Sequence, residues 1–134
     1  MLYIALLHYP VYNKNGNVVT TSIANMDIHD IARLSKTYGI QNFFVVHPLS
    51  AQRDLACEII NHWREGYGAV FNPPRREAFQ LVKLKASMDE VRAEILEQTG
   101  CPPRVIVTGA NFRDRLLTYT DLKIMIRKDV MQNY

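Results

Sequence analysis

Short apolar runs alternate with longer amphipathic segments along this chain. Residues 2–7, 42–46 and 104–108 are almost wholly apolar, which is typical of strands that are covered on both faces of a parallel sheet. Residues 82–86 instead alternate apolar side chains with Lys83 and Lys85. That period of two predicts an exposed or edge strand.

The segments between these runs carry helical signals. Ile28, Ile31 and Ala32 form an apolar stripe at helical spacing. Side chains that commonly cap helix starts precede several segments. Asn72 stands before two prolines, and Ser87 and Thr118 each stand three residues before an acidic side chain. The predicted helices span residues 27–38, 50–65, 72–79, 88–100 and 118–127.

Strands that alternate with helices predict a single α/β domain over residues 1–134. We expect a Rossmann-like, mostly parallel sheet with helices on both faces. Ligands of such sheets bind beyond the carboxyl ends of the strands. His8 and His47 end two of the predicted strands, and the sequence leaves open whether each has a functional or a structural role.

Composition narrows the class of protein. With 134 residues, 48% hydrophobic and 22% charged, the chain is neither disordered, collagen-like nor a disulfide scaffold. No apolar run approaches the roughly 20 residues of a membrane-spanning helix. Cys57 and Cys101 lack a CxxC partner, which indicates thiols in a reducing compartment. The N-terminus lacks the features of a signal peptide, so we expect a cytoplasmic protein without a membrane partner.

Common catalytic motifs are missing from the sequence. It contains no GxGxxG, GxxxxGK[ST], HExxH or GxSxG motif, and its four histidines lack metal-ligand spacing, so we expect no metal. Ten of its sixteen cationic side chains are arginine, and the net charge is +3. This balance permits a nucleic-acid partner, although ordinary surface solvation explains it equally well.

Two clusters could contact RNA. Arg33 lies inside the first predicted helix near Asp30, either as a functional cation or as part of a surface ion pair. Residues 63–68 (WREGYG) and 72–77 (NPPRRE) combine aromatic rings with arginines, which can stack on unpaired bases and hold phosphates. Alternatively, the tryptophan covers the core and the arginines are solvated. Paired arginines near a helix start oppose the helix dipole, which favours phosphate binding.

Several blocks of sequence appear together in the order of a known family. Residues 5–10 (ALLHYP), 25–33 (NMDIHDIAR), 63–68, 72–76 and 81–85 resemble a bacterial family of SPOUT-superfamily S-adenosylmethionine-dependent RNA methyltransferases. The first helix also resembles the motif of 2′-O-ribose methyltransferases, with Arg33 matching the motif arginine. Asp27 replaces the asparagine of those enzymes, which leaves the methylated atom open between ribose oxygen and base.

The resemblance implies S-adenosylmethionine as cofactor and tRNA or rRNA as partner. It implies that Arg33 serves catalysis, that a homodimer forms, and that a loop after the third buried strand holds the cofactor. The residues expected to bind the cofactor are Thr108, Gly109 and Ala110. Those expected to bind RNA are Asn25, Arg64, Tyr67, Arg75 and Arg76.

The resemblance also covers only the N-terminal part of a full family member. The family continues with another strand and a Gly-rich loop that complete a C-terminal trefoil knot. We therefore expect a SPOUT-type domain without its knot, truncated and weak or inactive as this chain. Two alternatives remain: a non-catalytic RNA-binding or protein-interaction module, and an unrelated α/β domain that binds a small anion at the strand ends.

Overall fold

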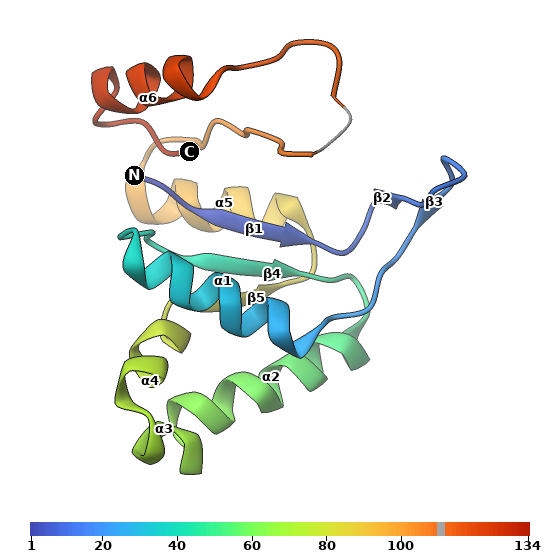
Figure 1. The fold of residues 1–134 in the computed structure, drawn as a ribbon, viewed down its shortest axis with the longest axis vertical. Helices are drawn as coiled ribbons and strands as arrows, with labels where there is room; N and C mark the ends of the chain where they lie inside the picture. Colours follow the sequence, from blue (N-terminus) through green and yellow to red (C-terminus); the bar gives the residue numbers. More distant parts are fainter. Residues whose placement is uncertain (110–111) are drawn as a thin grey trace. The chain divides into compact units, whose positions relative to one another are not determined.

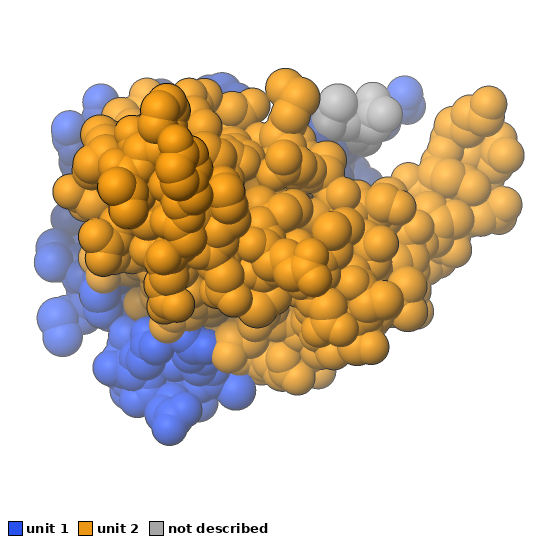
Figure 2. Space-filling model, turned by 90° about the horizontal axis from the view of Figure 1, so that it is seen from below, with its two compact units in different colours: residues 1, 92–134 blue, residues 2–91 orange. Residues whose placement is uncertain are grey.

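A computed structural model describes residues 1–109 and 112–134 (Figure 1). The chain separates into two compact units, coloured separately in Figure 2: residues 2–91 form one, and Met1 with residues 92–134 forms the other. A single domain over residues 1–134 stays a prediction. No helix within the two described ranges has the length and apolar character needed to cross a lipid bilayer.

The unit of residues 2–91 is built on a three-stranded parallel sheet. Strands β1 (Ile4–Leu7), β4 (Phe43–Val46) and β5 (Val82–Lys85) lie in the order β1-β4-β5. Phe43 pairs with Ile4 on one side and with Val82 on the other. The predicted parallel sheet is confirmed, and β5 is an edge strand as its alternating pattern indicates. All three strands end at the same edge of the sheet (Figure 1).

The central strand β4 is covered on both faces. Phe43 and Val45 join a buried cluster with side chains of the helices. Successive side chains of a strand point to opposite faces, so Phe44 and Val46 turn away from that cluster, yet they are just as buried. This double burial explains why the sequence of β4 is continuously apolar. The cluster itself comprises Ile23, Ile28, Ala32, Phe43, Val45, Ala56, Ile60, Ala78, Phe79 and Val82.

Four helices accompany the sheet in this unit: α1 (Asn25–Thr37), α2 (Ser50–Arg64), α3 (Tyr67–Phe71) and α4 (Pro73–Phe79). The side-chain oxygen of Asn72 accepts a hydrogen bond from the backbone N–H of Arg75 at 3.2 Å, which confirms the predicted cap of α4. The sequence did not predict α3, because five residues are too few to show a helical period.

A small hairpin precedes α1. It consists of β2 (Val11–Tyr12) and β3 (Val18–Val19), which pair antiparallel. The side chain of Asn13 accepts hydrogen bonds from the backbone N–H groups of Asn15 and Asn17 at 2.9 and 3.0 Å. The asparagine-rich residues 13–17 therefore form the tip of a hairpin.

The remaining helices begin at the predicted caps. Helix α5 (Met88–Thr99) begins in the unit of residues 2–91 and continues into the unit of residues 92–134, which also contains α6 (Tyr119–Lys128). The backbone N–H of Glu90 donates to the Ser87 hydroxyl at 3.3 Å, and the Glu90 carboxylate accepts from the N–H of residue 86. Thr118 caps α6 through the N–H of residue 121. Both capping predictions are confirmed.

The buried strand predicted at residues 104–108 is wrong. These residues form no strand, and the side chains of Val105, Ile106 and Val107 are exposed. A strand needs a neighbouring strand to satisfy its backbone N–H and C=O groups, and no strand pairs with this segment within residues 1–109 and 112–134. The N–H of Arg104 donates instead to the carbonyl oxygen of Asn133 at 2.9 Å.

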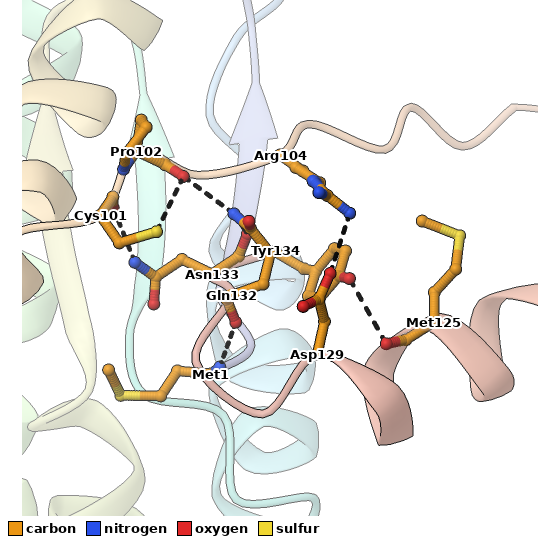
Figure 3. A network of polar contacts seen from close by, with 9 residues as sticks. All are labelled: Met1, Cys101, Pro102, Arg104, Met125, Asp129, Gln132, Asn133 and Tyr134. Carbon is orange, nitrogen blue, oxygen red and sulfur yellow. Dashed lines mark hydrogen bonds and ion pairs between the residues drawn. The ribbon is translucent and has the colours of Figure 1, made fainter.

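Figure 3 shows polar contacts within the unit formed by Met1 and residues 92–134. The amide nitrogen of the buried Asn133 donates to the Thr99 hydroxyl at 2.7 Å and to the Cys101 carbonyl at 2.8 Å. Arg104 pairs with Asp129 at 3.2 Å. These contacts fasten the segment after α6 to the segment after α5.

Candidate functional site

Arg33 lies on the exposed side of α1, two turns beyond Asn25, which is also exposed. The Arg33 guanidinium donates to the Asp30 carboxylate at 2.9 Å, with the two side chains 57% and 61% exposed. An ion pair this exposed contributes little to stability. Asp30 therefore orients Arg33 without burying it, and the catalytic assignment of Arg33 stays a prediction.

An aromatic cluster lies beside Arg33. The imidazole of His29 meets the rings of Trp63 and Phe79 edge-on, with centroid distances of 5.2 and 4.8 Å. Burial lowers the pKa of His29, and the positive charges of Arg75 and Arg33 lower it further. Arg33 lies one turn after His29 on the same helix. Trp63, which His29 contacts, comes from α2 and links this turn of α1 to α4.

Arg75 is held against the same tryptophan. Its guanidinium carbon lies 4.7 Å from the centroid of the Trp63 ring, within the range of a cation–π interaction. Its Nε atom is buried and has no hydrogen-bond partner among the described residues. We call Arg33, His29, Trp63, Arg75 and Phe79 the arginine–aromatic cluster. The alternative that Trp63 covers the core is confirmed, because its ring packs against the core cluster.

Arg64 has a structural role in this unit. Its guanidinium donates to the backbone carbonyl of Phe79 at 2.8 Å and to the carbonyl of Val82. Burial lowers the pKa of Arg64 below its ordinary value. These bonds join the end of α2 to the end of α4 and the start of β5. Its assignment to RNA stays a prediction, whereas Tyr67 on α3 and Arg76 on α4 are exposed.

The residues expected to hold the cofactor lie in the unit of residues 92–134. Thr108 and Gly109 are exposed, and Ala110 lies outside the described residues. A Cβ atom on Gly109 would lie 2.6 Å from the Phe112 ring, so a larger residue at this position would require the exposed Phe112 ring to move. The backbone groups of Thr108 and Gly109 make no backbone hydrogen bond with another described residue. Available donors and acceptors next to an aromatic ring suit the purine of an adenosine group.

Two buried histidines occupy the carboxyl edge of the sheet, with ring centroids 5.3 Å apart. The N–H of Leu49 lies 3.1 Å from Nδ1 of His47, and the carbonyl oxygen of Thr21 lies 2.8 Å from its Nε2. Both ring nitrogens of His47 therefore contact the backbone, which gives this side chain a structural role. Nδ1 of His8 lies 3.3 Å from the carbonyl oxygen of Val46.

We expect His8 to make stability depend on pH. Burial lowers the pKa of His8, and the adjacent His47 lowers it further. Protonation therefore favours the unfolded chain. The contribution of neutral His8 to the free energy of unfolding is fully present above the ordinary pKa of 6.5. It is lost as the pH falls through the lower pKa of the folded state.

Urea unfolding at pH 7 and pH 5 tests this expectation. The free energy of unfolding should fall toward pH 5, and His8→Gln should reduce that fall. It should not abolish it, because the pKa of His29 is lowered as well. Substitution of the exposed His62 by glutamine is the matched control. If stability depends on pH in His8→Gln as it does in the wild-type protein, His8 is not a source of the pH dependence.

Comparison with known proteins places these residues in a family. A family model described as SAM-dependent RNA methyltransferase matches residues 1–132. The chain belongs to this family. The resemblance deduced from the sequence blocks is therefore confirmed at the level of the family, and S-adenosylmethionine is the cofactor of that family.

Individual relatives share substantial identity with the chain. An Aquifex aeolicus protein called "Uncharacterized protein" is 39% identical over 127 residues, which are 95% of this chain and 62% of the relative. Proteins named tRNA (guanine-N(1)-)-methyltransferase from Oleidesulfovibrio alaskensis and Nitratidesulfovibrio vulgaris are 41% and 46% identical over 109 and 112 residues. Those matches cover 81% of this chain but 26% of each relative. The chain thus spans about a quarter of the two named methyltransferases.

Proposed function

We propose that this protein takes part in methyl transfer from S-adenosylmethionine to RNA. The proposal rests on the arginine–aromatic cluster in a chain of this family. His29 lies one turn before Arg33 on α1 and contacts Trp63, whose ring carries the Arg75 guanidinium. Two guanidinium groups near one aromatic cluster form a site that suits a phosphate and a base. The names of two relatives favour tRNA as the RNA class. We also propose a SPOUT-type domain that acts as a homodimer.

The roles of the chain's residues follow from the reaction. S-adenosylmethionine supplies a methyl group on a sulfonium, so the protein must mainly position an acceptor atom of the RNA in line with it. Arg33, oriented by Asp30, would hold a phosphate and stabilise charge on the acceptor. The backbone of Thr108 and Gly109, with Ala110, would hold the adenosine group. Asn25, Tyr67, Arg75 and Arg76 would hold the RNA.

A non-catalytic RNA-binding module is the second candidate. The matched segment is only 26% of the length of each named methyltransferase, so it can serve those proteins by binding RNA while other parts perform the chemistry. This candidate predicts RNA binding that weakens steeply with salt, without binding of S-adenosylmethionine.

Calorimetry with S-adenosylmethionine and transfer of a labelled methyl group to unmodified tRNA together test the proposal. Cofactor binding and weak label incorporation are expected, since the family resemblance predicts a weakly active chain. Salt-sensitive tRNA binding without cofactor binding would favour the non-catalytic module. Absence of both cofactor binding and RNA binding at low salt would contradict both functions.

A further inference from the structure

Helix α3 presents an exposed aromatic pair. The rings of Tyr67 and Phe71 are stacked, with centroids 6.2 Å apart and planes 18° from parallel. Their exposed fractions are 76% and 74%, and Val70 beside them is 83% exposed. Exposed apolar side chains that gather on one short helix mark a binding surface, because they contribute little to the core. We call Tyr67, Val70 and Phe71 the α3 patch.

The backbone beneath the α3 patch is fixed. Gly68 and Ala69 are buried, and a Cβ atom on Gly68 would lie 2.6 Å from Cε3 of Trp63. The N–H of Asn72 donates to the carbonyl of Gly68 at 3.0 Å. The helix therefore rests on the indole ring that also carries the Arg75 guanidinium. One tryptophan thus connects the exposed rings to a fixed positive charge.

Charge around the patch favours an anionic partner. Helix α4 begins two residues after Phe71 and supplies Arg75 and the exposed Arg76. Two acidic side chains lie near the patch in sequence. The charge of Glu77 is offset by its ion pair with Lys36 at 3.3 Å, and Glu65 lies on the other side of the patch from the two arginines in sequence. Aromatic rings beside arginines are the combination that binds unpaired nucleotides, because bases stack on the rings and phosphates pair with the cations.

We propose that the Tyr67–Phe71 pair is a stacking platform for an unpaired nucleobase of the RNA, with Arg76 and Arg75 on the adjoining phosphates. This inference rests on the proposed RNA function and narrows its substrate to RNA with exposed, unstacked bases. A paired duplex keeps its bases inside the helix, so it offers no face to the platform.

Binding of a short single-stranded RNA that contains 2-aminopurine tests the platform directly, since fluorescence of this base is quenched by stacking. Binding to the single strand should be tighter than to the same sequence in a duplex. Tyr67→Ala and Phe71→Ala should each weaken single-strand binding about tenfold and reduce the quench. The control is Tyr119→Ala, which removes a ring that is 94% exposed on α6 and should leave affinity unchanged.

The outcomes separate this inference from the function on which it rests. Two results would contradict the stacking platform without contradicting RNA binding. One is wild-type affinity for single-stranded RNA in both variants, and the other is equal affinity for duplex and single strand. No binding of either RNA by the wild-type protein at low salt would contradict the RNA function itself. If Tyr67→Ala weakens self-association in sedimentation without changing RNA affinity, the patch contacts a second copy and the inference is wrong.

Discussion

Replacing Arg64 with methionine is expected to lower the free energy of unfolding by about 3 kcal/mol. The substitution removes two hydrogen bonds from a guanidinium to the backbone carbonyls of Phe79 and Val82. A bond to a charged donor contributes roughly 1.5–3 kcal/mol, and the half-buried position of Arg64 favours the lower end of that range. The carbonyls also lose their partners at the junction between α4 and β5.

Urea unfolding of Arg64→Met and Arg76→Met measures this effect. Arg76 is exposed on α4, so its substitution should change stability by less than about 0.5 kcal/mol. Arg64→Lys should be intermediate, because an ammonium cannot reproduce the planar fork of donors. Wild-type stability of Arg64→Met, together with weaker RNA binding, would show that Arg64 serves RNA rather than the fold.

The elements that could be predicted from the sequence are those with local causes. Strand β4 is continuously apolar because both of its faces are covered, and the lysines of β5 mark an edge strand. The caps at Asn72, Ser87 and Thr118 act within three residues, so a short window of sequence contains the whole interaction.

The errors have non-local causes. The apolar residues 104–108 are typical of a buried strand, but pairing depends on a neighbour that their own sequence does not specify. Helix α3 is too short to show a helical period, so the sequence does not reveal that Tyr67 and Phe71, four residues apart, share one helical face. Arg75 lies twelve positions after Trp63, and nothing in that spacing predicts their cation–π contact.

In the candidate site, too, the sequence predicts the local grouping of residues but not the neighbour that each side chain contacts. The local pattern around residues 63–76 predicts a group of arginines and aromatic rings, and the structure adds the contact between Arg75 and Trp63. It did not distinguish the arginines from one another. Arg64 directs its donors to backbone carbonyls, Arg75 covers an indole, and Arg76 is exposed, because each faces a different neighbour in the folded chain.

Replacing Arg33 with alanine is expected to slow methyl transfer about 100-fold while changing stability by less than about 0.5 kcal/mol. Its ion pair with Asp30 is exposed, so the fold loses little. Loss of a cation that stabilises developing charge lowers kcat, whereas loss of a cation that only positions a phosphate raises KM. Single-turnover transfer of a labelled methyl group to tRNA at saturating and subsaturating RNA separates the two roles.

The matched control for Arg33 is Lys36→Ala, one turn further along α1. Lys36 also forms an exposed ion pair, to Glu77 at 3.3 Å, so its removal changes the net charge and the stability in the same way. Arg33→Lys keeps the charge but loses the fork of donors, and should recover only part of the rate. If Arg33→Ala and Lys36→Ala transfer methyl groups equally fast, Arg33 acts through general surface charge, and its assignment to catalysis is wrong.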